Sequence, residues 1–441
     1  MARMSMPAVS RRRFIQTSSV AASALAASAC GTPPPPAAAP APASGAPPAV
    51  PPSIAALKPF PGTATPIAES ERMARIEKAR KLMAEQGIAA LVLEHGTSMQ
   101  YFAGVRWGLS ERPFLLVIPQ KGDLAYVAPA FEEQRAREIT TFSNDVRVWQ
   151  EDEDWGALVA GILKDRGVAG GKVGLEERVR FFIAEGIRAA SPAGVQLTLA
   201  TPVTAGCRMF KSATEIALMQ RANDITIEAF RAAFATMKAG MTHVELGENI
   251  SAAFEALGAP GGSAGVQFGQ YTAFPHGSIQ PQKLTDGDVV LVDGGCSIQG
   301  YQSDITRTTV FGKASQRQIE VWNLEKKAQA AAFAAAKVGA TCESVDAAAR
   351  QVITEAGFGP GYKVPGLPHR TGHGIGMDGH EWTNFVKGNK TPLAPGMCFS
   401  DEPMIAIYGE FGIRLEDCLY ITEAGPKFFS QPSPALDQPF A

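Results

Sequence analysis

The sequence predicts two folded domains in series, an α/β domain over residues 67–206 and an α+β domain over residues 207–441. From Glu69 onward, amphipathic helical patterns alternate with short apolar runs typical of buried strands. Near Gly206 this alternation ends, two helix-start signals follow, and the later strand-like runs carry polar residues. With 441 residues, 45% of them hydrophobic, the chain is long enough for two domains with cores of their own.

The composition is that of an ordinary globular protein and excludes several function classes. The formal net charge is -2 and no long basic run occurs in the body of the chain, so we predict no nucleic-acid partner. A peptide or another small molecule is the expected ligand. The six cysteines lie far apart and form no CxxC pair, which argues against a zinc ribbon or a disulfide-stabilised scaffold.

The first 66 residues are predicted to lie outside the folded domains. The segment SRRRFIQ at residues 10–16, followed by a mildly apolar stretch, resembles a twin-arginine export signal that ends at residue 29. Ala27, Ser28 and Ala29 suit ordinary signal cleavage, whereas the same small residues before Cys30 also suit attachment of a lipid. Residues 30–66 are expected to form a Pro/Ala-rich linker without a core, because prolines favour extended polyproline geometry. We therefore expect an exported protein that is either periplasmic or a membrane-tethered lipoprotein.

The α/β domain begins with a predicted helix at 71–86, in which apolar residues recur every three or four positions up to Gly87. Buried strands are predicted at 88–93, 114–118, 124–127, 146–149 and 172–175, and helices at 131–138, 155–165 and 181–189. His95 is the only histidine of this domain, and no acid-base cluster with a familiar spacing accompanies it. The domain is therefore expected to have a structural role: it would shape access to a site in the other domain, mediate oligomerisation or supply one wall of a pocket.

Two capping boxes open the α+β domain. Ser212 with Glu215 begins a helix to about residue 238, and Thr242 with Glu245 begins a helix to about residue 257. Strand-like runs follow at 266–274, 288–293 and 306–311. Helices are then predicted at 316–337 and 343–356, and strands return at 397–400 and 412–421.

A predicted β-hairpin, DVVLVDGGCSIQGYQSDITRTTVF over residues 288–311, places two carboxylates side by side. Two β-branched runs flank a Gly-rich turn, so Asp293 ends the outgoing strand and Asp304 opens the return strand. Carboxylates crowded in this way repel each other unless a proton or a cation lies between them. The segment alone is equally consistent with solvated aspartates on an ordinary hairpin. Residues elsewhere in the chain must therefore decide between this interpretation and a cation site.

Three later segments supply further candidate ligands. His373 lies in HRTGHGIG at 369–376, Glu402 lies in DEP at 401–403, and Glu416 lies in RLED at 414–417. With Asp293 and Asp304 they offer four carboxylates and one imidazole. Such donors suit two hard or borderline divalent ions, such as manganese, cobalt or zinc. A thiolate-rich zinc site is excluded.

The order and spacing of these segments resemble the pita-bread metallopeptidases, the family of methionine aminopeptidase, Xaa-Pro dipeptidase (prolidase) and aminopeptidase P. The motifs DGGCSIQGYQSDITRT, HRTGHGIG, EP and GIRLED occur in family order, and the resemblance covers nearly the whole chain from residue 69. It implies a creatinase-like N-terminal domain, a pita-bread catalytic domain and a homodimer. It also implies two divalent ions per chain, with manganese as the first candidate. Asp304 and Glu416 would bridge the two ions, and Asp293, His373 and Glu402 would each bind one.

The same resemblance assigns roles around the metals. Glu402 would be both a ligand and a proton shuttle, and His276 and His380 match the two histidines that hydrogen-bond the scissile carbonyl or the tetrahedral intermediate. Arg414 lies two residues before the last ligand, on the same face of a strand, and is expected either at the substrate's carboxylate or braced against a nearby acid. His369 is a further candidate for substrate binding. The implied activity is that of an Xaa-Pro metallopeptidase, which cleaves the peptide bond before a penultimate proline.

Two alternatives stay open. A creatinase-like amidinohydrolase would share both domains but not the metal ligands, and an inactive peptidase fold would act as a binding protein at the cell envelope. All five ligand residues are present, which favours the enzyme. The sequence departs from the family at Met404 after the EP pair, at Asp378 and Gly379 before His380, and at Trp382 after it. These residues line or support the pocket, so the departures bear on substrate preference rather than on the metals.

Overall fold

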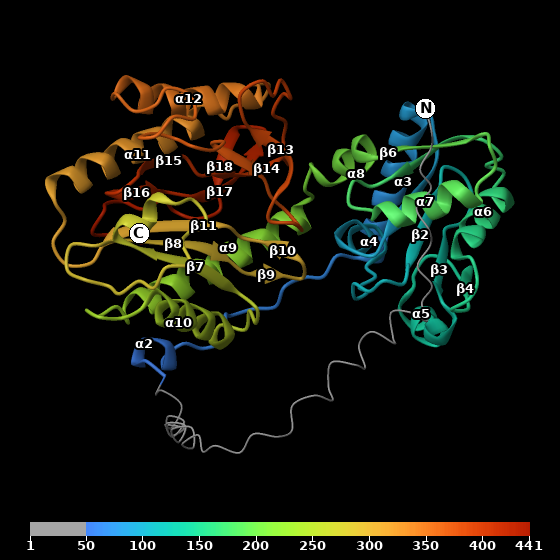
Figure 1. Cartoon of the computed structure of the whole chain (residues 1–441), viewed down its shortest axis with the longest axis horizontal. Helices are drawn as coiled ribbons and strands as arrows, with labels where there is room; N and C mark the ends of the chain where they lie inside the picture. The colour runs from blue at the N-terminus through green and yellow to red at the C-terminus, as the bar shows by residue number, and fades with distance from the viewer. Residues whose placement is uncertain (1–49) are drawn as a thin grey trace, which may run out of the picture. The chain divides into compact units, whose positions relative to one another are not determined.

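In the computed structural model of the chain, the described residues are 50–441 (Figure 1). The export signal predicted at residues 1–29 and most of the predicted linker lie outside the described residues. Residues 50–441 form one compact unit that contains an α/β domain followed by an α+β domain, as the sequence predicts. No helix within residues 50–441 has both the length and the apolar character needed to cross a membrane.

A six-stranded mixed sheet forms the centre of the α/β domain. Its strands are β1 (Ile88–Glu94), β2 (Leu115–Pro119), β3 (Ala125–Pro129), β4 (Val146–Trp149), β5 (Gly171–Leu175) and β6 (Val195–Leu199). They are arranged in the order β4-β3-β2-β1-β5-β6, with β1 antiparallel to β2 and parallel to β5. Strands β2 and β3 are buried along their whole length, which accords with their continuous apolar sequence and with cores on both faces of the sheet.

Helices cover both faces of this sheet. They are α3 (Glu69–Gln86), α4 (Thr97–Ala103), the 3-10 helix η1 (Ala130–Glu132), α5 (Glu133–Ile139), α6 (Trp155–Asp165), α7 (Phe181–Ala190) and α8 (Thr201–Arg208). Residues of α3, α4 and α8 share one core with the sheet, and residues of α6 and α7 share the other. The predicted elements of this domain are confirmed to within two residues, whereas α4, β6 and α8 were not predicted.

Three small sheets and a short hairpin build the α+β domain. The first sheet has three strands in the order β11 (Ile305–Val310), β8 (Val289–Gly295), β7 (Ser263–Phe268). The second has five strands in the order β13 (Glu381–Phe385), β12 (Gly372–Gly374), β14 (Cys398–Asp401), β17 (Asp417–Thr422), β18 (Gly425–Phe428). The third pairs β15 (Met404–Ile407) with β16 (Phe411–Arg414), and the hairpin pairs β9 (Ser297–Ile298) with β10 (Tyr301–Gln302). A single bridge between Thr306 and Glu416 links the first sheet to the segment that joins β16 and β17.

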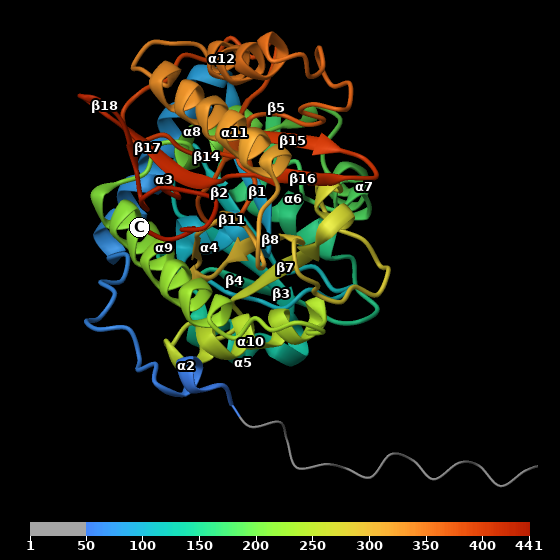
Figure 2. The ribbon, with the colours of Figure 1, turned by 90° about the vertical axis from the view of Figure 1, so that its left-hand side faces the viewer.

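Two helix pairs enclose these sheets. Helices α9 (Ala213–Phe234) and α10 (His243–Ala256) pack on β7 and β8, and helices α11 (Gln316–Ala335) and α12 (Cys342–Glu355) pack on the strands between β14 and β17. Figures 1 and 2 both show the two pairs on opposite sides of the strands. The capping boxes predicted at Ser212 and Thr242 are confirmed, since each side chain accepts the N–H of the glutamate three residues on.

The structure differs from the sequence predictions at three places in this domain. The single strand predicted at 412–421 is divided by Leu415 and Glu416 into β16 and β17. The strand predicted at 266–274 ends at Phe268, and a 3-10 helix, η2 (Gly269–Ala273), follows it. Gly269 has a φ of 54°, which L-residues rarely adopt and which turns the chain out of the extended conformation. The helix predicted to reach about residue 238 ends at Phe234.

The C-terminal part of the predicted linker also differs, because residues 51–62 pack on the α+β domain. The short helix α2 (Pro52–Ala55) buries Ile54, which is 2% exposed, in the core between α9 and α10. The Arg221 guanidinium of α9 donates to the carbonyls of Phe60 and Gly62 at 2.9 Å. Ile54, the partly buried Leu57 and Phe60, and these hydrogen bonds anchor a segment whose proline content alone predicted no packing.

Candidate metal centre

The predicted hairpin forms and brings two carboxylates to its tip. Asp293 lies in β8 opposite Thr306 of β11, and Asp304 directly precedes β11. The glycines of the motif allow this approach: a Cβ on Gly295 would stand 2.1 Å from the carbonyl oxygen of Ser303. A larger residue would therefore push the return strand, and Asp304 with it, away from β8.

The other three predicted ligands come from three separate strand ends and meet the hairpin. His373 lies in β12, Glu402 directly follows β14, and Glu416 lies between β16 and β17. Three overlapping groups have ligand atoms that all lie within 4.8 Å of one another: Asp293, Asp304 and Glu416; His373, Glu402 and Glu416; Asp304, His373 and His380. All five predicted ligands are thus brought together, and Asp304, Glu416 and His373 each belong to two of the groups.

The carboxylates of this cluster have too few hydrogen-bond donors. The Thr306 hydroxyl lies 2.9 Å from Asp293 Oδ1 and 2.7 Å from Glu416 Oε2, but its single proton serves only one of them at a time. Within residues 50–441 the buried Glu416 Oε1 has no hydrogen-bond partner at all. A buried carboxylate oxygen without a donor lowers the stability of the fold unless a proton or a cation occupies its lone pairs.

The electrostatics of the cluster lead to the same conclusion. Burial, followed by the neighbouring charges of Asp304 and Glu402, raises the pKa of Glu416 well above its usual range. Burial and the charge of Asp293 raise the pKa of Asp304 to about 7. Four carboxylates packed around one imidazole are the donor set and the charge that two divalent cations match, so the residues present fit a metal centre.

The orientation of the His373 ring also suits a metal ligand. Its Nδ1 lies 3.1 Å from the carbonyl oxygen of Gly374, and its Nε2 lies 3.2 Å from Glu402 Oε1. With Nδ1–H donating to the carbonyl, Nε2 keeps its lone pair and faces the carboxylates. Burial works against ionisation of Glu402. When the ring is protonated instead, Nε2–H donates to Glu402 Oε1, and this hydrogen bond and charge outweigh the burial of Glu402 and lower its pKa to about 2.

The two histidines expected near the scissile bond lie at the edge of the cluster. The ring of His380 stacks on the ring of His373 with centroids 3.8 Å apart. Partial burial and the adjacent His373 lower the pKa of His380 to about 4, so its imidazole is neutral at pH 7. His276 is exposed, between η2 and β8, and its charge also contributes to lowering the pKa of His380.

Arg414 is buried, and its guanidinium contacts three groups of the protein. Its Nη2 lies 2.6 Å from Asp293 Oδ2, its Nε donates to the Thr306 hydroxyl, and its Nη1 donates to the carbonyl of Pro275 beside His276. This geometry favours a brace for Asp293, and the expected contact with a substrate carboxylate stays a prediction. Asp417, three residues after Arg414, pairs with another arginine, Arg307, at 2.7 Å.

His369, the remaining candidate, lies half-buried beside the site. Its Nδ1 is 2.7 Å from the carbonyl oxygen of Arg370, and its buried Nε2 has no hydrogen-bond partner within the described residues. The charge of Glu402 acts on its pKa, but burial has the larger effect and lowers that pKa. Its predicted role in substrate binding is not decided by these contacts.

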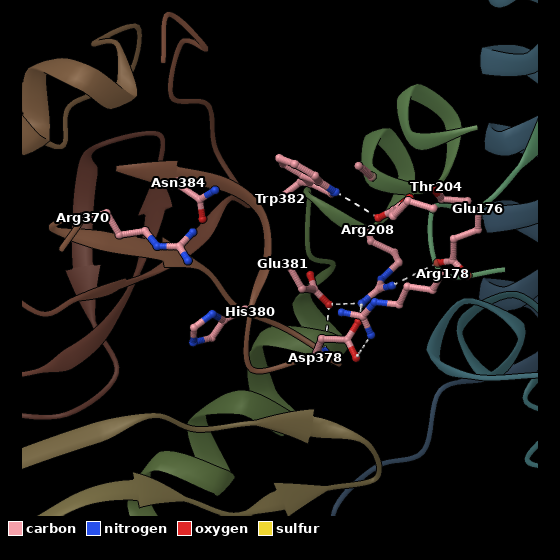
Figure 3. Close-up of a pocket in the computed structure, with 12 residues that line it drawn as sticks. Glu176, Arg178, Thr204, Arg208, Arg370, Asp378, His380, Glu381, Trp382 and Asn384 are labelled. Carbon is pink, nitrogen blue, oxygen red and sulfur yellow. Dashed lines mark hydrogen bonds and ion pairs between the residues drawn. The ribbon is translucent and has the colours of Figure 1, made fainter. Parts of the chain in front are cut away.

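An ionic network that the sequence did not predict joins the two domains next to His380. Arg208, at the end of α8, contacts both Asp378, at 2.6 Å, and Glu381. Lys211 lies 2.9 Å from Glu381 Oε2, and Arg178 lies 2.9 Å from Asp378 Oδ1. Figure 3 shows the side chains of Arg178, Arg208, Asp378 and Glu381 meeting around residues 376–382, which we call the His380 loop. No local sequence pattern marks the network, because Arg208 is about 170 residues from its acidic partners.

Comparisons with known proteins agree with this architecture. Residues 75–210 match the family model described as Creatinase/Prolidase N-terminal domain, and residues 217–423 match that of Metallopeptidase family M24. An uncharacterized peptidase of Schizosaccharomyces pombe is 36% identical over 392 residues, which cover 84% of this chain and 84% of the relative. An Xaa-Pro dipeptidase of Lactobacillus delbrueckii subsp. lactis is 29% identical over 82% of this chain and 98% of its own length. The crystal structure of dipeptidase PepE from Mycobacterium ulcerans matches with a TM-score of 0.78 and 32% identity, over 86% of this chain and 100% of that one.

A pita-bread catalytic domain behind a creatinase-type domain, with acidic and imidazole ligands at its centre, defines a hydrolase that uses divalent metal ions and acts on peptides. The chain belongs to metallopeptidase family M24.

Proposed function

We propose that the protein is a dinuclear peptidase that hydrolyses the peptide bond before a penultimate proline. The convergence of the five ligand residues, with two carboxylates shared between ligand groups, carries the proposal of two ions. The oxygen-rich donor set makes manganese the first candidate, with cobalt or zinc as the next. The proline preference is supported by relatives that are named Xaa-Pro dipeptidase.

Two divalent ions held in this way would supply Lewis acidity and a water of lowered pKa. Around them, the Glu402 carboxylate would accept a proton from the attacking water and pass it on. The neutral His380 donates an N–H toward the scissile carbonyl oxygen, and His276 supplies a second donor at the mouth of the site. Arg414 holds Asp293 in place. The proline nitrogen carries no hydrogen and leaves only after protonation. Glu402 would deliver that proton.

The alternatives are less well supported. A creatinase-like amidinohydrolase needs no metal ligands, and an inactive binding protein needs neither the ligands nor the two histidines. The described residues hold the five ligands and His380 within one cluster, and His276 lies near enough for its charge to act on the pKa of His380. Metal content is the quickest discriminator, because an inactive binder should purify without two divalent ions per chain and gain nothing from manganese.

The metal proposal is tested by elemental analysis of Asp304→Ala, Glu416→Ala and Glu402→Ala. The first two variants should lose both ions, since each side chain is proposed to bridge, whereas Glu402→Ala should keep partial occupancy and lose most turnover. Asp286→Ala serves as a control, because Asp286 is exposed and only seven residues from Asp293. Full activity in Asp304→Ala would rule out the two-metal mechanism.

The substrate proposal is tested with a panel of peptides and the manganese-loaded wild type. Xaa-Pro dipeptides and longer Xaa-Pro peptides should be cleaved, and Xaa-Ala peptides of equal length should be cleaved far more slowly. Efficient cleavage of the Xaa-Ala peptides would refute the proline preference while leaving the metal proposal intact.

We also propose export by the twin-arginine route, with the mature protein in the periplasm or tethered to the membrane through a lipid on Cys30, and assembly as a homodimer. Replacing Arg11 and Arg12 with lysine should leave the precursor inside the cell. Cys30→Ala should move the protein from the membrane to the soluble fraction, and an unchanged distribution would rule out the lipid anchor. Light scattering of the purified protein tests the dimer.

A further inference from the structure

The short β9–β10 hairpin leads directly into the proposed metal ligand Asp304. Figure 1 shows the hairpin on the side of the α+β domain that faces the N-terminal domain. Its second strand also contacts the His380 loop: the backbone N–H of Gln302 donates to the carbonyl of Gly376 at 2.8 Å, and the Gln302 amide donates to the carbonyl of Met377 at 3.3 Å. The hairpin is therefore the segment in which the metal cluster, the His380 loop and the N-terminal domain come together.

Tyr301 is the residue through which the N-terminal domain contacts this hairpin. Its side chain is buried, and its hydroxyl donates to Glu215 Oε1 at 2.8 Å and accepts from Arg75 Nη2 at 3.1 Å. Arg75 lies in α3 of the N-terminal domain, and Glu215 lies in α9 of the α+β domain. One hydroxyl thus ties the hairpin to both domains, with its proton and one of its lone pairs both used.

Arg75 is itself held firmly. Its side chain is 5% exposed; Nη1 donates to the carbonyl of Tyr101 at 2.9 Å, and the guanidinium lies 4.1 Å from the centre of the Tyr101 ring. Its Nη2 lies 2.9 Å from Glu71 Oε1 and 3.4 Å from Glu215 Oε1. Two carboxylates therefore match its charge, and groups on α3, α4 and α9 fix its position. A buried polar network with these partners is a rigid support for Tyr301.

The Asp304 carboxylate, by contrast, has few contacts of its own. Asp304 directly precedes β11, so it lies outside the ladder that pairs β11 with β8. Within residues 50–441 its carboxylate accepts no hydrogen bond from the protein, and His373 Nε2 lies 3.7 Å from its Oδ2. Carboxylates that bind metals are normally oriented by hydrogen-bonding partners around them. The direction of this carboxylate depends instead on the backbone that leads into it from Tyr301, three residues earlier.

We propose that Tyr301, held by Arg75 and Glu215, is a positioning residue for Asp304, so that the N-terminal domain sets the metal affinity of a centre to which it supplies no ligand. This inference rests on the proposed two-ion centre and deepens it. Asp304 is proposed to bridge the ions, so a shift of its backbone weakens both. Loss of a residue that orients a ligand lowers metal affinity by about 10- to 100-fold. Tyr301 acts through the backbone, so the lower end of this range applies.

The test is calorimetric titration of the metal-free full-length protein with manganese. Tyr301→Phe keeps the ring and removes only the hydroxyl, and its dissociation constant for manganese should rise about 10-fold. Arg75→Met should have a similar effect and Arg75→Lys a smaller one, since lysine keeps the charge but not the planar fork. The double variant Tyr301→Phe/Arg75→Met should lose no more affinity than Arg75→Met alone, because both changes act through one contact.

Tyr126→Phe is the matched control, because Tyr126 is buried in the N-terminal domain and its hydroxyl donates to the carbonyl of Thr141 in the same domain at 2.9 Å. Both tyrosine variants should lower the midpoint of urea unfolding of the metal-free protein, but only Tyr301→Phe should weaken manganese binding. Unchanged affinity in Tyr301→Phe, or an equal loss in Tyr126→Phe, would overturn the proposal, and Tyr301→Phe alone decides it should Arg75→Met fail to fold.

The proposed two-ion centre fails separately from this inference. A wild type that binds a single manganese ion per chain would refute the two ions, yet the same comparison of dissociation constants still decides whether Tyr301 positions Asp304.

Discussion

Replacing Glu381 with glutamine tests whether this buried carboxylate holds the His380 loop in place. Its side chain is 5% exposed and accepts four contacts: the Arg208 guanidinium, Lys211 Nζ at 2.9 Å, and the backbone N–H groups of Met377 and Asp378 at 2.9 and 3.1 Å. Glutamine keeps the shape but has one carbonyl oxygen, and its NH₂ group must face a donor. The variant therefore removes the charge and leaves at least one cation poorly matched.

The expected loss of stability follows from the pKa of the group. Burial works against ionisation, but Lys211 and Arg208 outweigh it and lower the pKa of Glu381 from 4.5 to about 2. A carboxylate with this difference between the unfolded and the folded chain contributes about 3 kcal/mol to the free energy of unfolding at neutral pH. Because the folded pKa is the lower one, the contribution is fully present above about pH 4.5 and is lost as the pH falls toward 2.

The assay is urea unfolding of metal-free wild type and Glu381→Gln at several pH values. At pH 7 the free energy of unfolding of the variant should be lower by about 3 kcal/mol, and at pH 3 the gap should shrink to about 1 kcal/mol. Glu77→Gln is the control: Glu77 forms an exposed pair with Arg80, so its loss should cost about 0.5 kcal/mol or less. A gap that does not change between pH 7 and pH 3 would show that the charge of Glu381 has no such role.

Three further changes test other parts of the fold. Ile54→Ala should lower the free energy of unfolding by about 2–4 kcal/mol in urea, because its buried side chain fastens α2 to the core; an unchanged value would mean that this segment is not anchored. Gly295→Ala should reduce the bound metal in elemental analysis, since its Cβ would stand 2.1 Å from the backbone leading into Asp304, and a wild-type metal count would contradict this. Arg307→Met should cost about 3–5 kcal/mol in the same urea assay, because it leaves Asp417 buried without its cation, and a loss below about 1 kcal/mol would show that the pair is dispensable.

The candidate metal centre could be predicted from the sequence because each ligand is marked by the residues next to it in the chain. Each ligand sits in a short motif whose glycines and strand pattern set its geometry, as Gly295 does for Asp304. The capping boxes at Ser212 and Thr242 are local in the same sense, since the interacting atoms lie three residues apart. Motifs of this kind carry both the residue type and the backbone conformation that the function needs.

What the sequence could not predict depends on which distant side chains meet. Arg414 was assigned to a substrate carboxylate or to a neighbouring acid on its own strand, yet the acid it contacts is Asp293, on the hairpin more than a hundred residues earlier. Strand alternation correctly predicts the face of a side chain, but it does not identify the partner across the sheets. The packing of Ile54, Leu57 and Phe60 is a similar case, because three apolar residues in a short proline-rich segment do not show which core they will join.

The departures from the family pattern around His380 gain an explanation from the domain contacts. Asp378 accepts from Arg178, Arg208 and Thr97, and Trp382 donates to Glu177. All four partners belong to the N-terminal domain or its last helix. Asp378 and Trp382, whose departure from the family pattern suggested a change in substrate preference, are therefore the residues through which that domain holds the His380 loop. The domain contains no ligand of the metal cluster among its described residues. Its ionic contacts nevertheless orient the loop that carries His380, and a change of Asp378 should therefore affect turnover without affecting the number of metal ions bound.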